Sequence, residues 1–600
     1  KHKKRNNIVL IVFVVMLFLY NFLFVPTASL LRRAKNLPDK IRPVKLAMAR
    51  QDLNMLGFEF EYLRGELVLI GKDVDKLKFF SFVPWVGSYI KDAKTISDLS
   101  IDILDTAEGL LLSLGESIPD LTFSGWGSSQ EIFTDDALSE LTAVSSALSE
   151  ELPKYKEEFR RINEGVGSIN IDKYPEEFKG MKIREMFMDL KNATSMLSIS
   201  FDDIVEFISI MPDLVGARKT KNYLIILQND KVLRPSGGVL SAYSVFSVGG
   251  GGLQVTKSGD MLMIDAPGKN VLCSSPSRYI REYLGTSCFY IRDAGFSSDY
   301  KVSGDKINEL WSKIPGTFPV DGILVLDTHF ISSLVRVVGN LSIDGFEEDI
   351  TEDTVVEQLV TFFGATGSHA SENMKQKDLT GALLYELMKK LFSSTNRQRI
   401  ELAKIIGIEA KEKHILFYFK DTRMQTFIEK YGAAGRVKDY EGDYLYISEA
   451  NVGNVGGNAN IRREIKKEIN ISDGAIVSNI TLKYKNEDLS DYSYKAYVRV
   501  YVPKGSSFED SSILSLPIET GEDLGKTYFG FLIDIPKEGE KEISLKYKLP
   551  TDGIVGLNKA YKLLIQKQPG LDSVSYEVFV NGDKKESVEL VTDKELEFSL

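Results

Sequence analysis

The stretch DGILVLD at 321–327, followed by THFISSLVRVV at 328–338, decides the expected fold. An apolar run with an acid at each end predicts a short buried strand, and the second stretch predicts a helix. The runs NYLIILQ at 222–228 and VLSAYSVFSV at 239–248 predict two more strands. Strands that alternate with helices indicate a layered α/β or α+β architecture for the central part of the chain.

The two flanking parts carry other patterns, so we expect an α+β multidomain protein. On the N-terminal side, apolar residues such as Leu56, Phe60 and Leu63 recur at three- and four-residue spacing, which is typical of amphipathic helices. Towards the C-terminus apolar and polar residues alternate, as in AYVRVYV at 496–502, which is typical of strands. The expected parts are a cytoplasmic tip and transmembrane anchor (1–28), a helical membrane-proximal region (29–215), a central α/β domain (216–440) and an antiparallel β-sandwich (441–600).

The segment from Ile8 to Val25, IVLIVFVVMLFLYNFLFV, predicts the membrane anchor. Its eighteen residues include one strongly polar side chain, Asn21. As a helix it would reach ~27 Å, enough to cross the core of a bilayer. A cleaved signal peptide is the alternative, although its apolar region would ordinarily be shorter. With no second spanning stretch in the sequence, we expect a single-pass protein whose bulk lies outside the cytoplasm.

The composition narrows the classes of partner and cofactor. There are 74 Lys and Arg residues against 85 Asp and Glu, a net charge of −11, so we do not expect a nucleic-acid partner. The four histidines include His329 and His414. We expect both to be packing or hydrogen-bonding residues, and we predict no metal site and no cofactor. Cys273 and Cys288 lie in a loop-like stretch and could form a disulfide in an oxidising compartment; two buried free thiols are the alternative.

Several stretches resemble the bacterial family catalogued as domain of unknown function 4012. They include YLIILQNDKVLRPSGG (223–238), IRDAGFSSDY (291–300) and PVDGILVLDTHFISSLVRVVGNLSI (319–343), and further stretches continue in order to about residue 570. Members of this family look like single-pass envelope proteins that are often associated with surface polysaccharides. The resemblance therefore implies a protein of the cell envelope, and it identifies no catalytic residue.

The pattern D-G-I-x-x-L-D … L-V-x-x-x-G at 321–339 is also loosely similar to LytR–CpsA–Psr proteins. That family moves glycopolymers from a polyprenyl pyrophosphate carrier onto the wall. Its arginine- and aspartate-bearing motifs are not recognisable in this chain, so its catalytic residues are not carried over. Mg²⁺ would be needed only if the chain shared this phosphotransferase activity.

Two loops hold the predicted ligand-binding residues, which are Arg234, Gly237, Gly238, Arg292, Asp293 and Asp299. In the first loop, RPSGG at 234–238, adjacent glycines allow close backbone approach, and the arginine could bind a phosphate or carboxylate bidentately. In the second loop an arginine beside an aspartate could pair across to the first loop and order a cleft. Structural ion pairs are the alternative for both loops.

Three functions remain open from the sequence. The leading hypothesis is an envelope protein that assists assembly or retention of a surface glycopolymer by binding an anionic or glycan ligand in its central domain. The second is a structural or adhesive surface protein that forms homo-oligomers. The third is a phosphotransferase like the LytR–CpsA–Psr proteins. The expected partners are therefore the lipid bilayer, an envelope glycopolymer or lipid-linked glycan, and a second copy of the chain.

Overall fold

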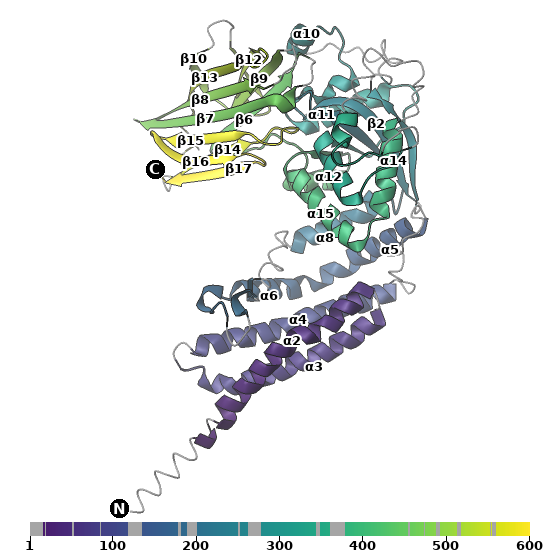
Figure 1. Ribbon diagram of the computed structural model, residues 1–600, viewed down its shortest axis with the longest axis vertical. Helices are drawn as coiled ribbons and strands as arrows, with labels where there is room; N and C mark the ends of the chain where they lie inside the picture. The colour runs from purple at the N-terminus through teal and green to yellow at the C-terminus, as the bar shows by residue number, and fades with distance from the viewer. Residues whose placement is uncertain are drawn as a thin grey trace, which may run out of the picture. The chain divides into compact units, whose positions relative to one another are not determined.

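The structure is a computed structural model, and it divides into two compact units that meet in the sequence between Arg218 and Lys219 (Figure 1). The described residues are 16–18, 20–50, 53–83, 86–117, 135–177, 182–185, 187–188, 201–249, 252–261, 264, 278–343, 349–359, 379–453, 457–472, 474–487, 493–512, 518–551, 554 and 560–599.

The first unit is built of helices, as the spacing of apolar residues predicted. Its main helices are α2 (Val25–Arg50), α3 (Leu53–Leu77), α4 (Val86–Ser117), α5 (Asp135–Glu151), α6 (Lys156–Gly167) and α8 (Phe201–Leu214). Leu56, Phe60 and Leu63 point inward and form one core with residues of α2 and α4. Burial of that apolar stripe is what stabilises such a bundle, because helical propensity alone contributes little.

Half of the predicted membrane anchor falls outside what the structure describes. Of the segment from Ile8 to Val25, residues 8–15 and 19 are outside the described residues, and Tyr20–Phe24 form one π-helical turn before α2. Within the described ranges we find no helix that combines the length and the apolar character needed to span a membrane. The anchor therefore stays a prediction.

A five-stranded mixed sheet forms the centre of the second unit, in the order β3-β2-β1-β4-β5. Its strands are β1 (Lys221–Asn229), β2 (Val239–Gly249), β3 (Gly252–Asp260), β4 (Gly322–Leu326) and β5 (Ile415–Phe419). Strands β1 and β4 are parallel, whereas β1–β2, β2–β3 and β4–β5 are antiparallel. The predicted strands at 222–228, 239–248 and 321–327 are thus confirmed.

Helices cover both faces of this sheet. Successive side chains of β1 point to opposite faces: Leu224 and Ile226 pack with α11 residues in one core, and Ile225 and Leu227 join the second core. The second core also takes residues of α12, α14 and α15. The helices of this domain include α10 (Arg278–Leu284), α11 (Tyr300–Lys313), α12 (Thr328–Val338), α14 (Leu379–Phe392), α15 (Asn396–Lys411) and α16 (Thr422–Lys430).

The C-terminal part forms two facing sheets, as the alternation predicted. The orders are β10-β13-β8-β7-β15-β16 and β11-β12-β9-β6-β14-β17, around one shared apolar core. The strands are β6 (Asp443–Asn451), β7 (Ile461–Ser472), β8 (Ala475–Asn486), β9 (Tyr494–Val502), β10 (Ser507–Ser511), β11 (Glu519–Asp523), β12 (Lys526–Ile535), β13 (Glu540–Leu549), β14 (Ala560–Gln566), β15 (Ser575–Val580), β16 (Asp583–Glu589) and β17 (Lys594–Ser599).

The expectation of a wholly antiparallel sandwich was wrong at two places. Strand β14 pairs in parallel with β6, and β15 pairs in parallel with β7. Both late strands join the sheets beside early ones, and the alternation of side chains is the same for either strand direction. The remaining pairs of the sandwich are antiparallel.

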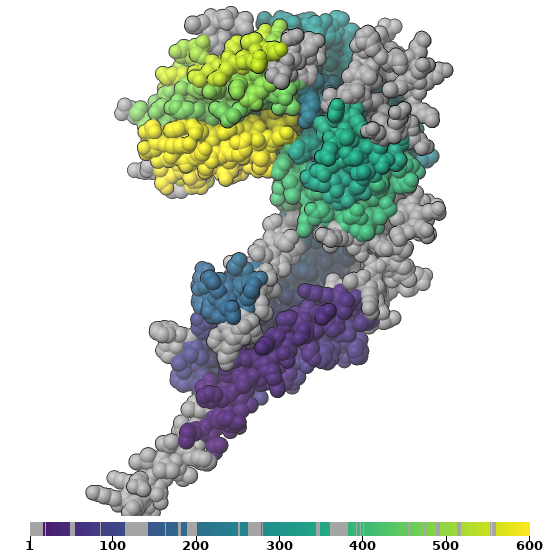
Figure 2. Space-filling model, in the orientation of Figure 1, coloured from purple at the N-terminus to yellow at the C-terminus, as the bar shows by residue number. Residues whose placement is uncertain are grey.

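The sandwich packs directly on the central domain within the second unit. In the space-filling view of Figure 2 the green and yellow atoms of the sandwich abut the teal atoms of that domain. Gln568 Nε2 donates to the carbonyl of Arg234 at 3.0 Å, and Lys413 Nζ donates to Asp593 Oδ1 at 2.6 Å. These contacts bring two loops of the sandwich, one after β14 and one between β16 and β17, against the central domain.

Candidate metal centre

The topology of the central sheet brings three polar positions to one edge. Because β1 and β4 are parallel, their carboxyl ends meet at the same edge, and Asp230 and Asp327 follow those two ends directly. Strand β5 runs antiparallel to β4, so its first residues lie at that edge too, and His414 directly precedes it. Crevices at the carboxyl ends of parallel strands are common ligand sites in α/β proteins.

Asp327 holds the first of the two histidines in a fixed orientation. Its Oδ2 atom lies 2.6 Å from His414 Nδ1, and both side chains are buried. Its Oδ1 atom accepts the backbone N–H of Phe330 at 2.9 Å and so caps α12. Burial raises the pKa of Asp327, and the neighbouring His414 only partly offsets this. A carboxylate at Nδ1 favours the proton on that nitrogen, which leaves a lone pair on Nε2.

The second histidine comes from the first turn of α12. The His329 ring stacks on that of His414, with centroids 4.1 Å apart and planes 13° from parallel. Its Nδ1 atom lies 3.0 Å from Asp572 Oδ1, in the loop of the sandwich that follows β14. This hydrogen bond raises the pKa of His329, against the opposing effect of burial, and holds the pKa of Asp572 below its usual range.

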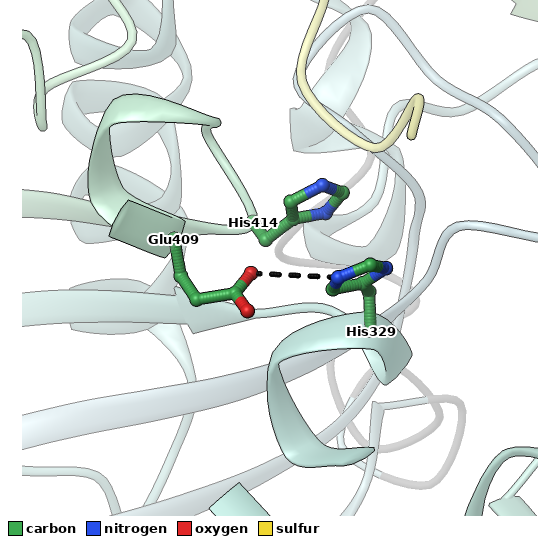
Figure 3. A group of neighbouring side chains, drawn as sticks. All are labelled: His329, Glu409 and His414. Carbon is green, nitrogen blue, oxygen red and sulfur yellow. Dashed lines mark ion pairs between the residues drawn. The ribbon is translucent and has the colours of Figure 1, made fainter. Parts of the chain in front are cut away.

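Glu409 supplies a carboxylate from near the end of α15. Its Oε1 atom accepts a hydrogen bond from Ser333 Oγ at 2.6 Å, and its Oε2 atom lies 3.7 Å from His329 Nε2. Ser333 belongs to α12, one turn beyond His329, so the same helix that presents the histidine also orients the carboxylate. Figure 3 shows the three side chains turned towards one another from separate elements.

Together His329, Glu409 and His414 have the composition of a divalent metal site. Each offers one ligand atom, and the three atoms lie within 4.8 Å of one another. Two buried atoms of this group, His414 Nε2 and Glu409 Oε2, have no hydrogen-bond partner among the residues that the structure describes. Unpaired buried polar atoms are costly and call for an explanation, and a bound cation supplies one. Two histidines and one carboxylate suit Zn²⁺ and related transition metals, but not Mg²⁺.

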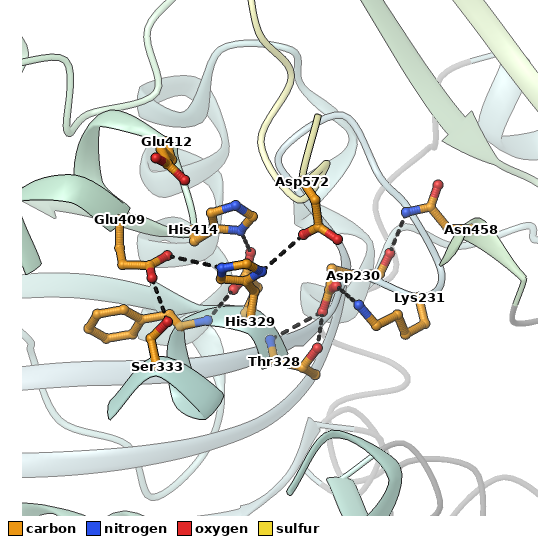
Figure 4. Close-up of polar contacts among 12 residues, drawn as sticks. Asp230, Lys231, Thr328, His329, Ser333, Glu409, Glu412, His414, Asn458 and Asp572 are labelled. Atoms are coloured by element: carbon orange, nitrogen blue, oxygen red, sulfur yellow. Dashed lines mark hydrogen bonds and ion pairs between the residues drawn. The ribbon is translucent and has the colours of Figure 1, made fainter. Parts of the chain in front are cut away.

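Hydrogen bonds from neighbouring residues hold the helix that carries His329 in place. Asp230 Oδ1 accepts hydrogen bonds from the backbone N–H and the hydroxyl of Thr328, at 3.1 and 2.6 Å, which fixes the start of α12 (Figure 4). Asp230 Oδ2 is 2.6 Å from Lys231 Nζ, and Asn458 Nδ2 donates to the Asp230 carbonyl at 3.0 Å. Hydrogen-bonded partners behind the ligands are the usual companions of protein metal sites.

The loop residues singled out in the sequence lie elsewhere. Arg234 is buried, donates to the backbone carbonyl of Asn451 and lies over the ring of Phe296 at 4.8 Å. Burial lowers its pKa to about 10. A Cβ atom on Gly237, which has φ +121°, would overlap the side chain of Gln228, and one on Gly238 would overlap the backbone of Asn229. This loop therefore packs within the fold.

The second predicted loop has structural contacts as well. The guanidinium of Arg292 lies over the ring of Tyr290 at 4.5 Å. Asp293 accepts the backbone N–H of Tyr290 at 3.2 Å, and burial raises its pKa. Asp299 caps α11 and pairs with Arg436 Nε at 2.9 Å. These are the contacts of the structural alternative, and ligand binding by either loop stays a prediction.

The sequence predicts packing or hydrogen-bonding roles for the two histidines, and both make hydrogen bonds, to Asp572 and to Asp327. It does not single out Glu409. A usable signal existed: His329 follows the predicted strand at 321–327, and His414 begins the apolar run HILFYF at 414–419, whose strand β5 pairs antiparallel with β4. The predicted pairing of Cys273 with Cys288 is untested, because Cys273 lies outside the described residues.

Comparison with known proteins adds a family for part of this domain. Residues 218–361 match the family described as "Protein of unknown function (DUF4012)". This segment is similar to that family. The match confirms the predicted resemblance over β1 to α12 and includes Asp230, Asp327 and His329; Glu409 and His414 follow it. The loose similarity to LytR–CpsA–Psr proteins stays a prediction.

The other comparisons carry no functional information. No curated protein matches the chain. One solved structure that matches is a proposed nutrient binding protein from Legionella pneumophila, at 9% identity and a TM-score of 0.19. The aligned part covers 24% of this chain and 55% of that protein, so this chain spans about half the length of that protein.

Proposed function

We propose that the protein is a membrane-anchored, extracytoplasmic envelope protein that binds a divalent transition-metal ion through His329, Glu409 and His414. The ion would hold an anionic group of a surface glycopolymer or of its lipid-linked precursor. The observation that carries the proposal is a pair of buried ligand atoms, His414 Nε2 and Glu409 Oε2, that have no hydrogen-bond partner among the described residues and lie beside a second histidine. The envelope location rests on the apolar N-terminal segment and the family resemblance.

The metal ion could bind an anionic group because only three protein side chains would coordinate it. Three protein ligands leave at least one coordination position open, as in sites that bind an exogenous group. His329 and Asp572 keep 38% and 67% of their side-chain surface exposed, so the centre has a side open to solvent. A phosphate or carboxylate oxygen is a suitable ligand for that open position. The proposal assigns binding and no reaction.

Metal binding is tested first on the full-length chain in detergent, after removal of metal with a chelator. Glu409→Gln keeps the size of the side chain and removes its charge, so we expect affinity for Zn²⁺ to fall by ~100-fold or more, beyond the range seen for outer-shell changes. Glu412→Gln is the matched control, because this carboxylate lies three residues further on and outside the triad (Figure 4). Isothermal titration with Zn²⁺, Co²⁺ and Mn²⁺ measures the affinities.

Unchanged zinc affinity in Glu409→Gln would overturn the assignment. The absorption spectrum of the Co²⁺-loaded chain gives a second readout, because nitrogen and oxygen ligands in a tetrahedral site produce intense visible bands. Bands of the same intensity in Glu412→Gln and the unaltered chain, and their loss in Glu409→Gln, are the expected pattern.

Binding of an anionic polymer is tested separately. We expect metal-loaded chain to bind a soluble polyglycerol phosphate, and binding to be lost both on chelation and in His329→Ala. Calorimetry on loaded and stripped protein measures the difference. Equal binding with and without metal would reject the role of the ion in holding the ligand, while leaving metal binding itself intact.

A further inference from the structure

A cluster of exposed phenylalanines lies at the turn between α3 and α4. Phe79 is 58% exposed and Phe82 74% exposed, and their rings meet edge to face with centroids 6.0 Å apart. Phe79 belongs to the short 3₁₀ turn Lys78–Phe80 that ends the first arm of this hairpin. Large apolar side chains grouped on a surface mark a contact with a partner or a membrane.

The cluster is continuous with the apolar N-terminal segment. The ring of Phe18 lies 5.2 Å from that of Phe79 in an edge-on contact, and it stacks on Phe22 at 4.7 Å. Phe18 and Phe22 both fall inside the predicted anchor from Ile8 to Val25. The hairpin turn and the end of the anchor are therefore neighbours in the first unit.

The last turn of the predicted anchor, just before α2, also exposes large aromatic side chains. Tyr20–Phe24 contain no buried residue, and Tyr20, Phe22 and Phe24 are 60%, 45% and 65% exposed. Side chains of this size would be poorly placed in water. Aromatic residues are favoured at the boundary between headgroups and acyl chains, where an apolar ring meets a polar layer.

We propose that Phe79 and Phe82, with Phe18 and Phe22, form a membrane-docking surface that enters the boundary region of the same bilayer that holds the anchor. The inference rests on the membrane anchor of the proposed function and is independent of the metal centre. The docked hairpin gives the chain a second attachment beside the anchor, so the first helices keep a fixed orientation on the membrane. The occupant is lipid because the cluster continues directly from the lipid-spanning segment.

Photo-crosslinking of the full-length chain in vesicles tests this surface. The chain is reconstituted in vesicles of unsaturated phosphatidylethanolamine and phosphatidylglycerol, with Phe82→p-benzoylphenylalanine as the probe. The matched control is Leu112→p-benzoylphenylalanine, since Leu112 is 64% exposed on α4, the helix that follows the turn containing Phe82. It lies 26 positions beyond Val86 (112 − 86), or about 39 Å along the helix axis. We expect lipid adducts at position 82 and none at position 112, read by mass spectrometry.

Flotation of the vesicles distinguishes a failure of the docking surface from a failure of the membrane anchor. A chain that floats with the vesicles but forms no lipid adduct at position 82 overturns the docking surface while the anchor stands. Adducts between two chains at position 82 overturn it in favour of a contact between copies. A chain that does not float overturns the anchor, and the docking surface with it.

Discussion

At the scale of single residues, Asp327 serves α12 and His414 at once. One carboxylate oxygen caps the helix through Phe330, and the other holds the histidine. Because asparagine caps helices as well as aspartate does, Asp327→Asn should keep the helix and remove the charge that orients the ring. We expect zinc affinity to fall by ~10–100-fold, the usual loss for an orienting partner, with little change in Tm. Competition with a fluorescent chelator measures the affinity.

Asp421→Asn is the control for this change. Asp421 caps α16 in the same domain by accepting the backbone N–H groups of Arg423 and Met424, and it makes no contact with the triad among the described residues. Equal zinc affinities in the two variants would show that the contact between Asp327 and His414 does not orient a ligand.

At the scale of elements, the loop after β14 packs against the loop between β1 and β2. A Cβ atom on Gly570 would lie 2.1 Å from the carbonyl oxygen of Gly237, and Gly570 has φ +76°. Gly316 has the same φ of +76° with no atom within 4 Å of its Cβ position. Comparing the same substitution at the two glycines therefore distinguishes the effect of steric overlap from that of backbone strain.

We expect Gly316→Ala to lower the free energy of unfolding by about 1–2 kcal/mol, the cost of the left-handed conformation. Gly570→Ala should lose a further ~1–3 kcal/mol, because the new methyl group overlaps the facing backbone. Urea denaturation followed by circular dichroism measures both. Equal losses would mean that the two loops do not pack against each other in solution.

At the scale of the whole molecule, Asp593 ties the sandwich to the central domain. Its carboxylate lies 2.6 Å from Lys413 Nζ and 3.1 Å from Lys438 Nζ. Burial alone would raise its pKa, but the two lysines and the backbone N–H of Lys567 outweigh burial and lower the pKa. Because the folded-state pKa lies below the unfolded value of ~3.9, this carboxylate adds stability above that pH. The contribution is lost as the pH falls through the folded-state pKa.

Asp593→Asn should therefore be less stable than the unaltered chain at pH 7, by ~3 kcal/mol, because the buried ammonium of Lys413 loses its counter-ion. The difference should shrink as the pH falls below ~4, because the unfolded chain there takes up a proton that the folded carboxylate of Asp593 does not yet bind. Guanidinium denaturation at pH 7 and at pH 3 measures it. Asp583→Asn, whose side chain is 79% exposed, is the control. A difference that stays constant with pH would contradict this account.

Sequence patterns predicted which segments form helices and strands better than they predicted which segments pair or pack with one another. Two-residue alternation located the strands of the sandwich, but it is identical for both strand directions and so missed the parallel pairs of β14 and β15. Arg234 beside two glycines resembles an anion-binding loop, yet Phe296 and Asn451, which cover it, are remote in sequence. The metal triad comes from three separate elements, and its spacing of 80 and 5 positions (409 − 329 and 414 − 409) matches no short motif.

The hydrogen bond between Asp572 and His329 limits which truncated fragments can be used to study the metal centre. Asp572 belongs to the C-terminal sandwich, whereas the proposed metal ligands belong to the central domain. An excised piece that ends near residue 440 would retain all three ligands and yet lack one of the groups that aim them. Weak zinc uptake by such a truncated product would reflect the missing C-terminal strands, so dissection into separate fragments is the wrong way to assay this centre.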